Sequence, residues 1–201
     1  MRHYCRRPAI GALAVLFAVA ATGCADESPP KVVDVPIDRS AELAKFREES
    51  GASTEPAALV GGAESRDALV RDFVAALATS DSAAFRRLMI SGGEFAWFYY
   101  PGHPLVAPPY NMPPALLWMQ IVQRSNKGLF RALERFSGAG LELVRWSCAD
   151  APKFRYGPST VWERCTVQLR GGRAPADSLQ LFGEILERNG RVKFVDYTNP
   201  F

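Results

Sequence analysis

Two segments in the last third of the chain constrain the fold most, because both alternate between apolar and polar residues and each contains one cysteine. They are residues 141–148 and 160–169. When Cys148 is placed opposite Cys165, the pattern predicts an antiparallel hairpin with its turn centred at Tyr156-Gly157. A slip of one residue would send every side chain to the other face, so the register is tightly specified. This register also pairs apolar residues across the strands: Trp146 with Val167, and Val144 with Leu169.

A second hairpin is predicted where Asn189-Gly190 separates Ser178–Glu187 from Arg191–Tyr197. Asn-Gly between apolar runs favours a two-residue turn, because both residues tolerate the positive φ that this turn requires. Asp196 would then share a strand face with apolar side chains. A carboxylate in such surroundings has a raised pKa and can act as a general base. The alternative is a solvated or hydrogen-bonded aspartate near the chain end.

The first 24 residues have the three parts of a secretory signal. Met1–Pro8 is basic, Ala9–Thr22 is a 14-residue run of apolar and small residues, and Gly23-Cys24 precedes a polar segment. The apolar run is too short for a transmembrane helix, which needs about 20 residues. We therefore expect an exported protein.

The residues Ala21-Thr22-Gly23-Cys24 resemble the lipobox of bacterial lipoproteins. The resemblance implies that residues 1–23 are removed as a lipoprotein signal peptide. Cys24 then becomes the first residue and is acylated with chains such as palmitate, which anchor the protein to a membrane of the cell envelope. Ala25 after the cysteine favours the outer membrane. The alternative is an ordinary signal peptide followed by an unmodified cysteine.

Export also bears on the remaining thiols. Cys5 leaves with the signal peptide and Cys24 carries the lipid, so only Cys148 and Cys165 stay free to pair. An even pair of cysteines in an exported domain favours a disulfide. The alternative is two buried free thiols.

Charge divides the exported part into two regions. The whole chain has 24 Lys and Arg against 21 Asp and Glu, and residues 1–23 contain the entire excess, so the mature protein is formally neutral. Since nucleic-acid-binding domains are normally basic, we expect no nucleic-acid partner. Residues 24–64, with 4 basic and 9 acidic residues and several prolines, read as a tether with one short helix, Ala41–Glu49. Residues 65–201, with 17 basic and 12 acidic residues, form the domain.

The domain is expected to begin with helices. Apolar residues recur at helical spacing in four segments: 65–78, 82–90, 115–124 and 129–136. The aromatic run 95–100, bounded by Gly92-Gly93 and Pro101, favours a strand. Residues 101–114 contain six prolines and cannot form regular structure.

The order of helices, aromatic strand, helix and C-terminal antiparallel strands resembles the NTF2-like superfamily, which includes SnoaL-type and ketosteroid-isomerase-type proteins. The resemblance rests on Leu69–Leu77, on Asp81 before Phe85 and Leu88, and on the ending Gly190–Tyr197. It implies an α+β fold in which N-terminal helices pack on a curved antiparallel sheet, forming a cone with a pocket. The Pro- and Tyr-rich segment 101–114 is then an insertion.

The aromatic and proline segment supplies the ligand-binding candidates. Aromatic side chains bury large areas and often keep a polar tip for a partner. The functional interpretation is a lid or wall over the pocket, and the alternative is ordinary core packing. The candidates are Trp97, Tyr99, Tyr100, His103, Tyr110 and Trp118.

Other chemistries are restricted by composition. His103 is the single histidine of the mature chain, so a site with several histidine ligands for a metal is excluded. The sequence also has none of the common nucleotide, zinc-protease or nucleophile-elbow motifs, and we expect no metal and no cofactor.

Three functions remain open. The first is a lipid-anchored, non-catalytic module that binds a small apolar ligand or a partner protein, with a closed aromatic pocket lacking a clustered acid and base. The second is an isomerase or hydrolase, in which polar groups converge inside the pocket. The third is a subunit of an envelope complex, which requires a large exposed apolar patch.

Lipidation of Cys24 is directly testable. Mass spectrometry of the protein purified from the membrane fraction should show acylated Cys24 as the N-terminal residue. A soluble, unmodified protein that begins at another residue would contradict the lipobox interpretation.

Overall fold

The computed structural model describes residues 38–172, 174 and 177–200, so the expected signal peptide, Cys24 and the first part of the expected tether lie outside the described residues. The described residues form one compact unit. Five α-helices come first: α1 Arg39–Glu49, α2 Arg66–Thr79, α3 Ser82–Leu88, α4 Gly92–Glu94 and α5 Pro114–Phe136. Between α4 and α5 lie a π-helical turn and two 3₁₀ turns: η1 Phe95–Tyr99, η2 Tyr100–Gly102 and η3 Pro104–Val106.

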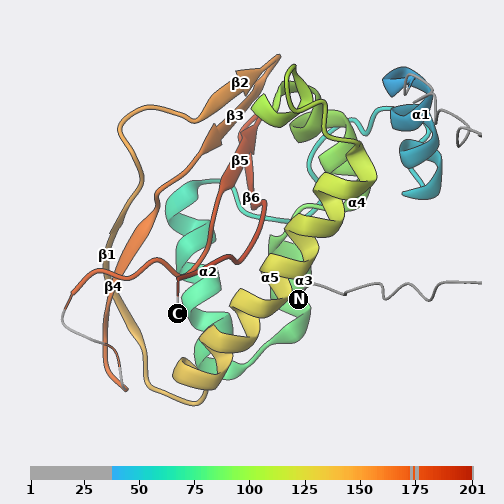
Figure 1. Ribbon diagram of the computed structural model, residues 1–201. Helices are drawn as coiled ribbons and strands as arrows, with labels where there is room; N and C mark the ends of the chain where they lie inside the picture. Colours follow the sequence, from blue (N-terminus) through green and yellow to red (C-terminus); the bar gives the residue numbers. More distant parts are fainter. Residues whose placement is uncertain (1–37, 173, 175–176, 201) are drawn as a thin grey trace, which may run out of the picture. The chain divides into compact units, whose positions relative to one another are not determined.

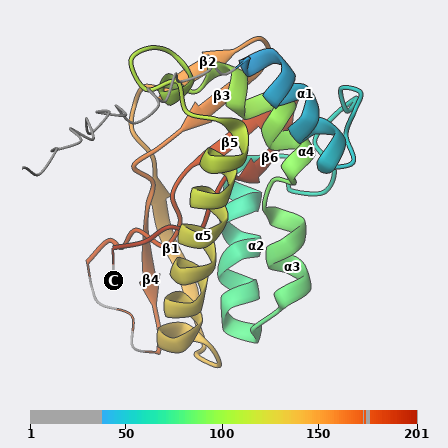
Figure 2. The ribbon, with the colours of Figure 1, turned by 45° about the vertical axis from the view of Figure 1, so that its right-hand side comes forward.

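In the described residues, six strands form two small antiparallel sheets. One sheet has the order β1-β4, and the other has the order β2-β3-β5-β6. Figures 1 and 2 show β1 and β4 on one side of α2 and α5, with α3 beside α2. The strands are β1 Glu142–Ser147, β2 Phe154–Tyr156, β3 Ser159–Trp162, β4 Thr166–Arg170, β5 Ile185–Arg188 and β6 Arg191–Phe194.

The α+β class is confirmed, but a cone is not shown, because neither sheet is strongly curled and the two are separate. Part of the reason lies at Arg164, whose φ of 54° is left-handed and interrupts the predicted strand 160–169. The interruption separates β3 from β4, so one expected long hairpin contributes to both sheets.

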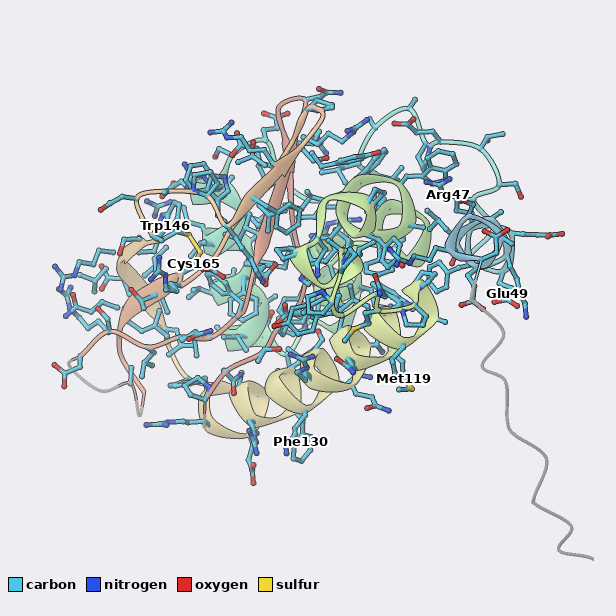
Figure 3. All side chains as sticks on the ribbon, turned by 45° about the horizontal axis from the view of Figure 1, so that its top comes forward. Arg47, Glu49, Met119, Phe130, Trp146 and Cys165 are labelled. Atoms are coloured by element: carbon cyan, nitrogen blue, oxygen red, sulfur yellow. A yellow bond between two sulfur atoms is a disulfide. The ribbon has the colours of Figure 1, made fainter. Side chains whose placement is uncertain are left out.

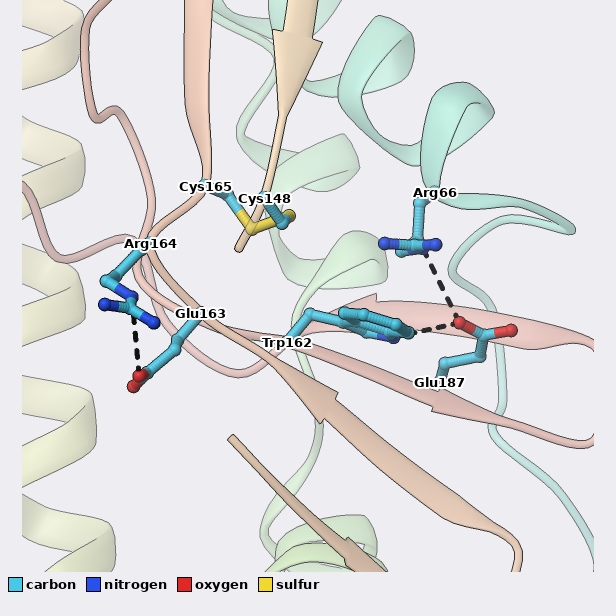
Figure 4. The surroundings of a disulfide bond; sticks show 7 residues. All are labelled: Arg66, Cys148, Trp162, Glu163, Arg164, Cys165 and Glu187. Atoms are coloured by element: carbon cyan, nitrogen blue, oxygen red, sulfur yellow. Dashed lines mark hydrogen bonds and ion pairs between the residues drawn. A yellow bond between two sulfur atoms is a disulfide. The ribbon is translucent and has the colours of Figure 1, made fainter. Parts of the chain in front are cut away.

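The disulfide between Cys148 and Cys165 is confirmed, with an S–S distance of 1.97 Å. Trp146 pairs with Val167 as expected. The register shifts between Leu143 and Arg145, so Leu143 rather than Val144 faces Leu169. Figure 3 places Trp146 near Cys165, and Figure 4 shows Arg66 of α2 close to Trp162 and Glu187 beside the disulfide.

Both predicted turns exist, one of them displaced. Asn189-Gly190 joins β5 to β6, with Arg188 paired to Arg191, as the sequence predicts. In the first hairpin Tyr156 pairs with Ser159, so the turn is centred at Gly157-Pro158, one residue later than expected. The ladder of β1 with β4 has the predicted pairing of Trp146 with Val167. The shift therefore arises in the irregular pairing between the two cysteines and this turn.

The predicted aromatic strand is wrong: residues 95–99 are π-helical. The cause is a capping box just before it. Ser91 accepts a hydrogen bond from the Glu94 N–H at 3.2 Å, and Glu94 accepts one from the Ser91 N–H at 2.7 Å. This reciprocal pair of hydrogen bonds starts a helix, and the aromatic residues 95–99 continue it. Glu94 also forms a buried ion pair with Lys193 of β6 at 2.8 Å, which fixes the helical segment to the second sheet.

Helix α5 is continuous, although Ser125–Gly128 reads as a break in the sequence. These residues serve packing instead. The Ser125 hydroxyl accepts a hydrogen bond from the Tyr197 N–H at 3.1 Å. At Gly128 a Cβ atom would lie only 2.0 Å from the Tyr197 carbonyl oxygen, so the C-terminal segment can approach the helix only where no side chain exists.

Replacing Gly128 with alanine should therefore destabilise the fold. In a helix interior alanine is more stable than glycine by about 1 kcal/mol. The clash with Tyr197 should outweigh this gain, so the free energy of unfolding should fall by about 1–3 kcal/mol. Chemical denaturation measures this. Gly140→Ala is the matched control, because a Cβ there meets nothing within 4 Å, and its effect should stay within about 0.5 kcal/mol. Equal effects of the two substitutions would refute the packing role.

Candidate functional site

A cavity of about 270 Å³ opens between the 3₁₀ turns, helix α5 and the ends of the second sheet. Its apolar wall consists of Pro104, Leu105, Leu117 and Ile121. The polar residues that line it come from five segments far apart in the sequence: Tyr99, His103, Arg124, Lys153, Glu184, Asp196 and Thr198.

Glu184, just before β5, is the centre of the polar wall. Its carboxylate accepts a hydrogen bond from the Tyr99 hydroxyl at 2.8 Å and an ion-paired hydrogen bond from Lys153 Nζ at 2.5 Å. Burial raises the pKa of Glu184, while Lys153 acts in the opposite direction. Burial, with the adjacent Glu184 carboxylate, also raises the pKa of Tyr99, so its phenol stays protonated and remains a donor.

Asp196 lies two residues beyond β6 and next to Glu184. The Glu184 carbonyl accepts a hydrogen bond from the Val195 N–H at 2.8 Å, and the Asp196 carbonyl accepts one from the Gly183 N–H at 3.1 Å. The β5–β6 pairing thus continues past the strands and brings both acids to one place. A Cβ at Gly183 would lie 2.2 Å from Asp196 Oδ1, so the absence of a side chain at this position makes room for the Asp196 carboxylate.

The Asp196 carboxylate is held by its own chain segment. Its Oδ1 accepts a hydrogen bond from the Thr198 N–H at 2.7 Å. Burial raises its pKa, although the bonds from Thr198 act in the opposite direction. Two carboxyl groups with raised pKa values therefore line the same cavity, and such groups are common where proteins bind or transform ligands.

His103 contributes a neutral imidazole. Its ring packs against Tyr99 and Phe154, with centroids 5.1 and 5.7 Å apart. Burial, with help from the positive charges of Lys153 and Arg124, lowers its pKa to about 4. Because Nδ1 accepts a hydrogen bond from the Leu105 N–H at 3.2 Å, the neutral ring carries its proton on Nε2.

Of the aromatic candidates, Tyr99 and His103 line the cavity. Trp97 lies elsewhere: it donates to the Ala52 carbonyl at 2.8 Å and stacks under Arg47 of α1. Tyr100 donates to the Met112 carbonyl at 2.8 Å within the core. Trp118 packs against the Phe95 ring at 5.1 Å, and Tyr110 is 65% exposed. From the Pro-rich segment, Pro104 and Leu105 form part of the wall.

Sequence reasoning missed Glu184 and Lys153. Glu184 stands within Leu181-Phe182-Gly183-Glu184-Ile185-Leu186, so the argument that singled out Asp196, an acid among apolar residues, applies to it equally. Lys153 has no comparable signal, because it lies in an irregular segment before β2 and reaches the site only through the fold.

Other site types are not evident in the part of the chain that the structure describes. Among those residues, no group of three or more His, Cys, Asp or Glu side chains is arranged to hold a metal ion. In the same residues no helix has the length and apolarity needed to cross a bilayer. No protein-family profile, curated protein or solved structure matches the chain, so the NTF2-like relationship stays a prediction.

The lowered pKa of His103 predicts a pH-dependent stability. Between pH 6.5 and about 4 the unfolded chain binds a proton at this ring and the folded chain does not, so stability falls as the pH falls through this window. Glu184 and Asp196 act in the opposite direction, since their raised pKa values make the folded state take up protons first.

The difference between wild type and His103→Gln isolates the histidine. Between pH 7 and pH 4 the free energy of unfolding of the wild type should fall by on the order of 2 kcal/mol more than that of the variant. Urea denaturation at a series of pH values measures this. A difference that stays constant over the range would mean that the ring is not buried as described.

Proposed function

We propose that the domain binds a small amphipathic molecule in this cavity and that the lipid anchor holds it at the cell envelope. The observation that carries the proposal is that buried Asp196 and His103 and partly buried Glu184 meet an apolar wall in one hollow. Ligand pockets combine apolar surface with a few fixed polar groups in this way, and 270 Å³ lies near the lower end of their usual size.

The geometry indicates how a ligand would bind. Its apolar body would pack on Leu105, Leu117 and Ile121, which come from η3 and α5. Its polar end would accept a hydrogen bond from His103 Nε2–H and donate one to the Asp196 carboxylate. Glu184 is already held by Tyr99 and Lys153, so it fixes the wall more than it contacts the ligand.

A second candidate function is acid–base catalysis on the bound molecule. It is favoured by the convergence of polar groups that an enzyme requires and that a purely aromatic pocket lacks. Asp196 is the candidate base, because burial raises its pKa toward the range where a carboxylate takes up a proton efficiently. His103 Nε2–H is the candidate donor to a developing negative charge.

An NTF2-like relationship is also proposed. Helices that precede antiparallel strands and a pocket bordered by both support it. The α+β class alone does not specify that family, and the superfamily contains both binding proteins and enzymes, so the function rests on the site rather than on the relationship.

The binding proposal is tested with the neutral fluorescent probe Nile red. The larger side chain of Leu105→Trp should occupy part of the cavity and weaken binding at least about tenfold, which corresponds to about 1.4 kcal/mol. Tyr110→Ala on the same segment is the matched control, because its side chain points to solvent, and it should leave the affinity unchanged.

Equal affinity of the two variants, or no binding by the wild type, would contradict the proposal.

Catalysis is tested separately with small ketones deuterated next to the carbonyl. Loss of deuterium that requires Asp196, and disappears in Asp196→Asn while Nile red still binds, would favour the enzyme.

A further inference from the structure

The outward face of helix α5 exposes large apolar side chains. Leu116, Met119 and Phe130 are 39%, 46% and 67% exposed. At 3.6 residues per turn these three positions fall on one side of the helix, away from the buried positions Leu117, Ile121 and Phe136. Figure 3 shows Met119 and Phe130 projecting from the same side of α5. Single exposed apolar residues are ordinary, but here three lie along one side of a helix, with the polar residues Gln123 and Lys127 between Met119 and Phe130.

Positive charge flanks this stripe. Helix α5, every residue of which is described, contains one acid, Glu134, and four basic residues: Lys127, Arg131 and Arg135, and Arg124, which also lines the candidate cavity. The neighbouring helix α3 adds Arg86 and Arg87 in its last turn and has no acid between Ser82 and Leu88. Together the two helices carry an excess of five positive charges, which equals the whole excess of residues 65–201.

An apolar hollow lies between the same two helices. It has a volume of about 330 Å³, and its walls include Phe85 and Met89 on one side and Leu129 and Leu133 on the other, with Arg86 at its edge. The exposed stripe, the hollow and the basic residues all lie on these two helices, and we call them together the α3–α5 face.

We propose that the α3–α5 face docks on an anionic lipid surface. Exposed apolar side chains beside several Lys and Arg residues are the combination that holds a helix in a membrane interface, where the apolar groups enter the acyl boundary and the cations meet headgroup phosphates. A protein partner would need a complementary acidic surface, whereas an anionic bilayer supplies both requirements at once.

The expected anchor makes the contact geometrically possible. Cys24 precedes the first described residue, Asp38, by 14 positions. An extended chain of that length spans at most about 50 Å, so the domain stays within reach of the bilayer to which Cys24 is attached. Docking through α5 would fix the orientation of the domain on the membrane.

The test uses the full lipidated chain reconstituted into vesicles of phosphatidylcholine, with or without phosphatidylglycerol. Gln123→Cys, within the exposed stripe, is labelled with bimane under non-reducing conditions that preserve the disulfide. Arg145→Cys on β1 is the matched control, since it is exposed in the two-stranded sheet. In vesicles with phosphatidylglycerol, a nitroxide on the lipid chain should reduce emission at position 123 at least about twofold, because an interfacial helix lies 5–10 Å deep.

Emission from position 145 should not change, and Lys127→Glu with Arg131→Glu should abolish the quenching at position 123. Unquenched emission from position 123 in anionic vesicles would overturn the proposal. The proposal would also be overturned if the bimane at position 123 were shielded from water without vesicles and the shielding increased with protein concentration. That result would assign the face to contact between copies of the chain.

Discussion

The candidate site depends on one largely buried carboxylate, Glu184, whose side chain is 15% exposed. Removing a charge from water costs several kcal/mol unless it is paired and hydrogen-bonded, so its partners are structurally necessary. Lys153 supplies the opposite charge and Tyr99 supplies a second hydrogen bond. Because these residues come from the irregular segment before β2 and from the π-helical turn, their contact with Glu184 brings three separate parts of the chain together. The cavity exists where these parts meet the apolar side of α5.

Much of the fold could be predicted where local chemistry and tertiary packing agree. The Asn189-Gly190 turn and the Cys148–Cys165 pair have strong local signals, and the structure contains both. Prediction failed where two local signals competed. Aromatic residues after Gly92-Gly93 suggested a strand, whereas the capping box of Ser91 and Glu94 starts a helix. The left-handed backbone at Arg164 had no sequence signal, because non-glycine residues adopt it only when the surroundings require it.

The site was only partly predictable for a related reason. Tyr99, His103 and Asp196 were recognisable as polar or aromatic groups in apolar sequence, and all three line the cavity. Lys153 became part of the site only because tertiary structure places it beside Glu184. Trp97 and Tyr100 had the same sequence signal as Tyr99, yet their polar atoms bond to backbone carbonyls of Ala52 and Met112. Sequence pattern identifies groups that need a partner, and the fold decides whether that partner is the chain itself or a ligand.

The central claim is that Glu184 and Asp196 are buried together in one cavity. It is tested most directly by ¹³C NMR of the side-chain carboxyl carbons between pH 3 and pH 8, with assignments from Glu184→Gln and Asp196→Asn. Burial raises both pKa values, so the two resonances should titrate above those of exposed carboxylates. Titration of both at the ordinary values, about 4, would contradict the account, because it would mean that the carboxylates face water.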